Sequence, residues 1–126
     1  MVIENFTNAL SNTFKTSKIK DGIFKIETGA SFINNQPIVL ILEQKENKWF
    51  LTDGKTTLKY MNELYELKSE DVKMCIKNVL KIYNFSMQSA MIVTEIENLD
   101  IFLPKYFDML MCIGQLANMF AFFDKP

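Results

Sequence analysis

Glu43 and Lys45 stand two positions apart at the end of the apolar run PIVLILEQK. A carboxylate at a buried strand end can bind Mg²⁺, and a nearby lysine can position water or stabilise the charge on a phosphate under attack. A metal site of this kind needs a further acid. Asp21 and Glu27 lie upstream at suitable distances along the chain, and Glu4 lies on the first predicted helix.

This acid-x-lysine pattern resembles the signature of the PD-(D/E)xK nucleases. It supports one functional hypothesis, a Mg²⁺-dependent nuclease or a degenerate nucleic-acid-binding relative that uses Glu43, Lys45 and Asp21. The residue types are common in a lysine-rich chain, and a charged strand end that enters a hairpin loop explains them without catalysis. We therefore keep this hypothesis as the alternative.

Asp53 is the next acid to weigh, because it follows the aromatic segment KWFLT and precedes Gly54. Its carboxylate could serve as a metal ligand or as an acid–base group. Strand-to-helix turns, however, favour Asp because its side chain accepts backbone hydrogen bonds at the start of a helix. We predict that Asp53 caps a helix that begins near Lys55, with Thr52 or Thr56 sharing this role.

Three lysines repeat at every fourth residue and therefore share one face of a predicted helix: Lys73, Lys77 and Lys81. Such a face is most often only solvated. As a functional site, it would bind an acidic protein surface or nucleic-acid phosphates. Further lysines would extend the face if the fold brings them near it: Lys15, Lys18, Lys20 and Lys25.

The chain lacks two residue types on which much catalysis depends. Its 126 residues include no His, and all 14 basic residues are Lys. Without His there is no Ser–His or Cys–His nucleophile pair and no imidazole metal ligand. Without Arg there is no planar fork to bind a phosphate in a bidentate manner. The formal net charge of −1 argues against a general nucleic-acid coat.

The two cysteines, Cys75 and Cys112, are far apart in the sequence and each lies in a helical pattern. We predict two buried, reduced thiols in a cytoplasmic protein. Two cysteines without His do not make a zinc site, so we expect no metal and no other cofactor. The N-terminal segment shows no basic region followed by a long apolar run, and we expect no signal peptide.

The elements that position these residues follow from hydrophobic periodicity. Segment 2–15 carries apolar residues at helical spacing and predicts a first amphipathic helix, followed by a short basic connector that ends at Asp21-Gly22. Three strands then form an antiparallel meander, with turns at Asn34-Asn35 and at KENK. Their sequences are GIFKIETGASF, PIVLILEQ and KWFLTD. The second is expected to be buried on both faces, because its apolar run is nearly continuous.

The second half of the chain is predicted to be mainly helical. A short helix covers Leu58 to Tyr65, and Ser69 followed by two acids begins a helix with a buried stripe that ends at Tyr83. The segment FSMQSAMIVTEI predicts one or two strands. Pro104 suits the first turn of a last helix over 103–122.

This last helix is apolar nearly all round, which is typical of a helix that is buried on two sides or that meets a partner. Burial in the core is the first interpretation, and a homodimer contact is the second. The residues predicted for that contact are Phe107, Leu110, Ile113 and Met119. The polar residues within the helix argue against a membrane span.

Several short segments resemble domain of unknown function 1828, a family of small bacterial and phage proteins. In that family a strand ends in a Leu-Thr-Asp-Asp-Gly-type turn, followed by Thr and a hydrophobic residue, and a closing helix carries a Leu-Ala-Asn/Asp-like stretch. The matching residues here are Leu51, Thr52, Asp53, Thr57 and Leu58, then Leu103-Pro104 and Leu116-Ala117-Asn118. The resemblance extends over roughly residues 20 to 122. This chain departs from the pattern because Gly54 comes one place early and the second acid is absent.

The resemblance implies a cytoplasmic α+β domain of a kind often carried by phages and mobile elements, and it implies no established activity. Together with the residues, it leads us to expect a single α+β domain over 1–126. The expected function is binding to a protein, most concretely inhibition of a host defence system in the manner of an anti-CRISPR protein. The expected partner is a defence effector complex; nucleic acid is less favoured, no membrane is expected, and a homodimer would form through the last helix.

Overall fold

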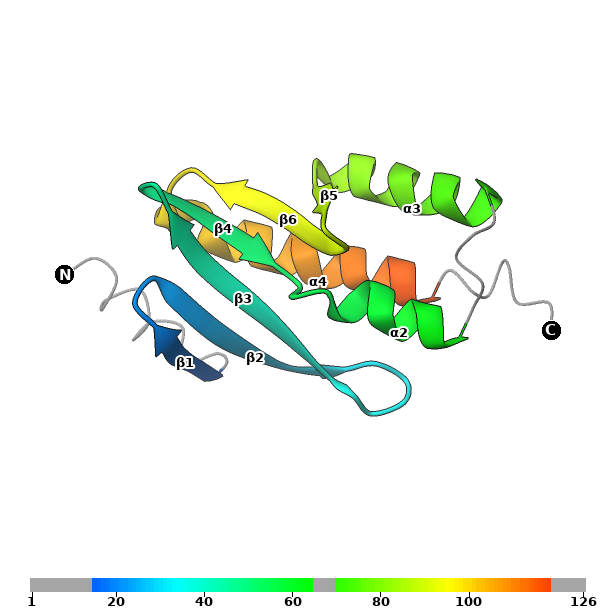
Figure 1. The fold of residues 1–126 in the computed structure, drawn as a ribbon, viewed down its shortest axis with the longest axis horizontal. Coiled ribbons are helices and arrows are strands. Elements are labelled where there is room, and N and C mark those ends of the chain that lie inside the picture. The colour runs from blue at the N-terminus through cyan, green and yellow to red at the C-terminus, as the bar shows by residue number, and fades with distance from the viewer. Residues whose placement is uncertain (1–14, 65–69, 119–126) are drawn as a thin grey trace.

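The computed structural model describes residues 15–64 and 70–118, which form an α+β fold (Figure 1). In this part of the chain, a six-stranded antiparallel sheet is formed by β1 (Lys15–Lys20), β2 (Ile23–Ser31), β3 (Pro37–Lys45), β4 (Lys48–Thr52), β5 (Ser86–Gln88) and β6 (Met91–Ile96). The helices are α2 (Thr56–Leu64), α3 (Glu70–Tyr83), the short 3-10 helix η1 (Leu99–Ile101) and α4 (Phe102–Asn118).

The strand order β1-β2-β3-β4-β6-β5 contains the predicted meander as its centre, β2 to β4. The segment FSMQSAMIVTEI, predicted to give one or two strands, forms two, β5 and β6, which extend the sheet at one edge. The predicted basic connector at residues 15–20 was wrong, because this segment is edge strand β1 and pairs Thr16 with Ile26. Lysine-rich edge strands resist pairing with other chains, and the same composition looks like a loop in the sequence. The rest of the predicted first helix lies outside the described residues.

Tight turns between the strands match the turn residues of the sequence. Glu46 and Asn47, with φ of 52° and 66°, make a two-residue connection between β3 and β4. This left-handed pair matches the twist of an antiparallel hairpin. Gly22 at φ 77° closes the β1–β2 turn, where a residue with a Cβ would be strained. The sequence therefore specifies these connections locally.

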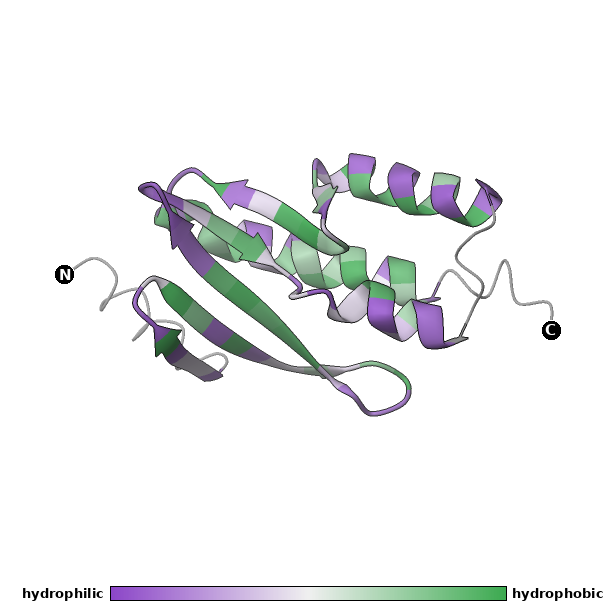
Figure 2. Ribbon diagram, in the orientation of Figure 1, coloured by the Kyte–Doolittle hydropathy of each residue, from purple (hydrophilic) through white to green (hydrophobic). Residues whose placement is uncertain are grey.

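The hydrophobic core lies on one face of the sheet. In β3, Ile38, Leu40 and Leu42 are buried while Val39 and Ile41 between them are only half-buried. The central strand is thus fully buried on one face only, not on both as its apolar run suggested. Figure 2 shows the apolar centre of β3, and α4 as the most apolar of the helices.

Helix α4 lies behind β4 and β6 in Figure 1 and contacts both α2 and α3. Its inner face is fully or almost fully buried: Phe102, Tyr106, Met109, Cys112, Ile113 and Leu116. The predicted last helix is therefore present and buried along one side, and residues 119–122 of the prediction lie outside the described part. Of the helices in the described ranges, none combines the length and the apolar character that crossing a membrane requires.

Candidate functional site

Asp53 is fully buried and its carboxylate accepts three backbone hydrogen bonds. Oδ1 accepts from the nitrogens of Lys55 at 3.1 Å and Ile92 at 2.9 Å, and Oδ2 accepts from that of Thr57 at 3.1 Å. The bonds from Lys55 and Thr57 satisfy donors at the start of α2, which is a helix-capping role. The bond from Ile92 joins the same carboxylate to β6. All three donors are backbone N–H groups, so the carboxylate of Asp53 stabilises the fold.

The residues of the nuclease hypothesis lie near one end of the β1–β3 part of the sheet. Glu43 forms an ion pair with Lys45 at 3.4 Å. Asp21 lies in the neighbouring turn, fully exposed, and forms an ion pair with Lys18 at 2.8 Å. The hydrogen bond and the charge of Lys18 lower the pKa of Asp21. Each carboxylate thus already has a lysine partner.

The other acids proposed for that site do not gather around Glu43. In the β2–β3 pairing, Glu43 is opposite Ile23 and Glu27 is opposite Val39. Ile23 and Glu27 are four residues apart on β2, about 13 Å at the rise of a strand. Glu4 lies outside the described residues. Within 15–64 and 70–118, no three His, Cys, Asp or Glu side chains gather closely enough to hold a metal ion.

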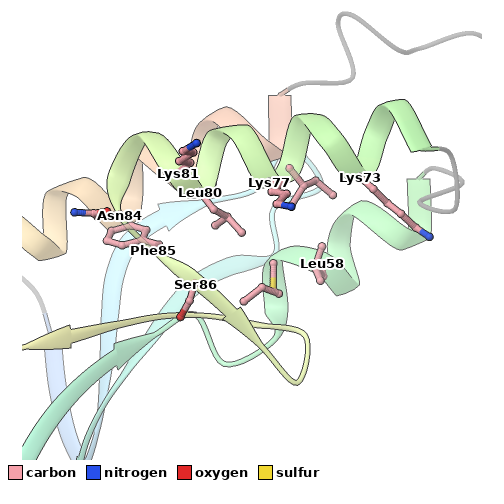
Figure 3. A pocket seen from close by; sticks show the side chains of 10 residues that line it. Leu58, Lys73, Lys77, Leu80, Lys81, Asn84, Phe85 and Ser86 are labelled. Carbon is pink, nitrogen blue, oxygen red and sulfur yellow. The ribbon is translucent and has the colours of Figure 1, made fainter.

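A groove of about 760 Å³ lies between α2, α3 and β5, and we call it the α3 groove (Figure 3). Its apolar lining comes from three elements and the α3–β5 connection: Leu58, Ile76, Leu80, Phe85 and Met87. Leu80 and Phe85 are buried and the others are half-buried. The predicted lysine row, Lys73, Lys77 and Lys81, forms the exposed border along α3.

The sequence of α3 explains where this helix begins and ends beside the groove. Glu70 and Asp71 occupy its first turn, where acids favour the positive end of the helix dipole. Asn84 then ends the helix with φ 62°, and the nitrogen of Phe85 donates to the carbonyl of Leu80 at 3.0 Å. This left-handed helix end turns the chain sharply. As a result, Phe85 folds back into the groove and β5 begins directly beside it.

The charged side chains among the described residues of the α3 groove are all positive. None of the described residues that line it is acidic. Lys73 lies 3.9 Å from the exposed Glu70, an ion pair that water screens strongly, and the described residues give Lys77 and Lys81 no ion pair. Lys105 of α4 adds a further positive charge nearby, with Nζ 6.0 Å from the centre of the Phe85 ring. An anionic ligand with an apolar side is therefore the chemical complement of this groove.

The other lysine cluster of the sequence does not extend this face. Lys15, Lys18 and Lys20 lie on β1, and Lys25 lies on the adjacent β2. β1 and β5 are the opposite edges of the six-stranded sheet. With strands about 4.8 Å apart, these edges are separated by roughly 24 Å. The lysine row on α3 is therefore separate from them, and they can serve as a matched control in mutagenesis.

The residues predicted for a homodimer contact do not share one side of α4. Phe107 is 51% exposed, Leu110 is half-buried, Ile113 is fully buried in the core, and Met119 lies outside the described residues. The exposed apolar row of α4 consists instead of Leu103, Phe107 and Met111, spaced every fourth residue. A contact through this helix would use that row, because Ile113 is not accessible to a partner.

The two cysteines differ in their surroundings. Cys75 on α3 is half-buried, whereas Cys112 on α4 is fully buried, and neither forms a disulfide. Burial, with a smaller contribution from the charge of Asp53, raises the pKa of Cys112 to about 12. A thiol with so high a pKa is a poor nucleophile at neutral pH. Cys112 is thus a core residue.

The sequence identified the lysine row but missed the apolar half of the groove. The sequence places Leu58 on a predicted helix and Phe85 and Met87 in the predicted strand segment FSMQSAMIVTEI. Nothing in their spacing shows that they meet, because the tertiary structure alone brings α2, α3 and β5 together. The local signal closest to the site is the left-handed Asn84, which directs Phe85 inward.

Comparison of the chain with family models, curated proteins and solved structures finds no match. The resemblance to domain of unknown function 1828 stays a prediction from the residues.

Proposed function

We propose that this protein acts by binding another protein through the α3 groove, and that its role is to inhibit a host defence system in the manner of an anti-CRISPR protein. The observation that carries the proposal is the combination of an apolar lining with a border of three lysines and no acid among the described lining residues. The inhibitor role rests on the resemblance of the chain to a family found in phages and mobile elements.

The groove has the two properties that a protein-binding site needs. Apolar side chains that lose water on binding supply affinity, and they are most effective when a polar border surrounds them. The lysines increase the rate of encounter with an acidic partner and disfavour basic ones. Since the chain carries a formal net charge of only −1, this positive field is a local property of α3 and not of the whole molecule.

The test compares two charge-reversal variants of the full chain in a defence-competent host. The first is Lys73→Glu, Lys77→Glu and Lys81→Glu. The second, Lys15→Glu, Lys18→Glu and Lys20→Glu, makes the same change in net charge at the opposite edge of the sheet. We expect the wild type and the second variant to co-purify with a defence effector complex in stoichiometric amounts and to block target cleavage, and the first variant to do neither.

Two results would contradict the proposal. Inhibition that the first variant retains would separate the groove from the function. Mg²⁺-dependent DNA cleavage in the purified protein, lost in Glu43→Ala, would favour the nuclease alternative at the end of β3. Circular dichroism of both variants controls for folding, which these changes of exposed lysines on α3 and on the edge strand β1 should preserve.

A further inference from the structure

The α3 groove restricts the shape of its occupant as well as the charge. Lys73, Lys77 and Lys81 follow one another along two turns of α3 (Figure 3). At a helical rise of 1.5 Å per residue, neighbouring lysines are about 6 Å apart and the row is about 12 Å long. Leu58 from α2 and Leu80 from α3 both point into the space beside this row. The occupant must therefore offer several negative charges in line and an apolar surface next to them.

Other anionic ligands meet only part of this requirement. A fatty acid has a single carboxylate at one end of its chain, so it would pair with one lysine of the three. A nucleic-acid strand has repeated phosphates, but its bases bind to exposed aromatic rings. Among the described residues that line the groove, the one aromatic is Phe85, which is buried with 7% of its surface exposed. It therefore offers no open ring for a base to stack on.

We infer that the α3 groove is the docking site for an acidic amphipathic α-helix of the partner protein. On such a helix, carboxylates at every fourth residue repeat at about 6 Å, which matches the lysine row. The apolar stripe next to them faces the half-buried Leu58, Ile76 and Met87, a helix-in-groove mode of recognition. This inference rests on the proposed function, because it specifies which segment of the partner enters the groove.

The experiment measures the binding of two fluorescein-labelled helical peptides to the full chain by anisotropy. In the first peptide, Glu at every fourth position adjoins a Leu stripe. The second has the same composition, with the Glu residues moved to the side opposite the Leu stripe. We expect the first to bind about tenfold more tightly or better, which corresponds to about 1.4 kcal/mol. Its affinity should fall as salt is added, because the charges are exposed.

Variants of the protein locate the binding. Lys73→Gln, Lys77→Gln and Lys81→Gln together should weaken the first peptide about tenfold, and Met87→Glu should also weaken it. The matched variant Lys15→Gln, Lys18→Gln and Lys20→Gln should leave the affinity unchanged. Equal binding of the two peptides, or binding that is indifferent to the α3 lysines, would overturn the inference. So would tighter, groove-dependent binding of an oligothymidylate or of phosphatidylglycerol vesicles.

The outcome separates the inference from the proposed function. If the first peptide does not bind but capture and inhibition of the effector complex still depend on the α3 lysines, the partner uses the groove with another kind of surface. The docking inference then fails and the proposed function stands. If neither the peptide nor the complex depends on these lysines, both fail.

Discussion

The carboxylate of Asp53 and the backbone nitrogen of Ile92 are joined by a hydrogen bond of 2.9 Å. Asp53 follows β4 and precedes α2, whereas Ile92 belongs to β6, the neighbour of β4 in the sheet. One side chain thus fixes the start of a helix and the position of a strand that is remote in sequence. Asp53, predicted to cap the helix after β4, thus also links that helix to β6.

Replacing Asp53 by Asn should destabilise the protein strongly. An amide has one acceptor oxygen instead of two, so its NH₂ group would face at least one backbone donor in a fully buried site. Loss of hydrogen bonds to a charged group, with a donor left unpaired, costs about 3 kcal/mol. Urea unfolding followed by circular dichroism measures this difference. Asp71→Asn, an exposed change in the first turn of α3, is the control and should stay within about 0.5 kcal/mol.

Thr57→Val should have the opposite effect on stability. The Thr57 hydroxyl is buried and has no hydrogen-bond partner among the described residues. Valine has nearly the same shape and removes the unpaired polar group, so we expect a gain of about 1 kcal/mol in the free energy of unfolding. The same urea titration measures it. A loss of similar size would show that the hydroxyl has a partner in solution, such as a buried water molecule.

The two thiols should react at very different rates in the folded protein. Cys112 is fully buried and its pKa is raised to about 12, whereas Cys75 is half-buried. A disulfide reagent at about pH 8 should modify Cys75 first, and Cys112 only after unfolding in urea. Cys75→Ser should abolish the early reaction. Rapid modification of both thiols in the native protein would contradict the burial of Cys112.

Stability should fall in alkaline solution because of the same thiol. The pKa of Cys112 is raised from 9.0 to about 12 on folding, so between these values the thiol ionises in the unfolded chain but not in the folded one. The folded state then binds more protons, and the free energy of unfolding decreases as pH rises. Burial raises the pKa of Tyr106 as well, with the same sign above pH 10. Unfolding at about pH 8 and about pH 10 tests this, and the decrease should be smaller in Cys112→Ala.

A homodimer through α4 stays a prediction, and the exposed row of Leu103, Phe107 and Met111 is the surface that would form it. Sedimentation equilibrium of the wild type should show dimer at high protein concentration. Phe107→Glu should shift the protein to monomer, because a charge is disfavoured at the centre of an apolar contact. Ile82→Glu, an exposed change on α3, is the matched control and should leave the equilibrium unchanged. A wild type that stays monomeric would exclude this contact.

The strands and helix starts that depend on local sequence patterns were predicted best. β2, β3 and β4 were recognisable from their apolar and aromatic runs, and the start of α2 from the acid at Asp53. β1 was missed because its lysines and hydroxyl residues are as common in loops, and only its pairing with β2 makes it a strand. The start of α3 was visible because the acids Glu70 and Asp71 mark its first turn.

Contacts between residues on different elements could not be predicted from those local patterns. The spacing of the α3 lysines predicts a shared face but not that Leu58 and Met87 lie beside it. The capping role of Asp53 is local, whereas its bond to Ile92 depends on the pairing of β4 with β6. Likewise, the apolar character of α4 did not distinguish Phe107, which is exposed, from Ile113, which is buried.

The described residues that line the α3 groove all lie between the end of β4 and the start of β6. These two strands are direct neighbours, so one segment of the chain that connects adjacent strands forms the groove. The hydrogen bond from Ile92 to Asp53 joins the two ends of this segment. Closing a loop of this length costs about 3 kcal/mol of chain entropy, and the cost rises only slowly with further length. The proposed binding surface is therefore formed by one continuous part of the chain. New specificities could be selected or grafted within it while the sheet stays the same.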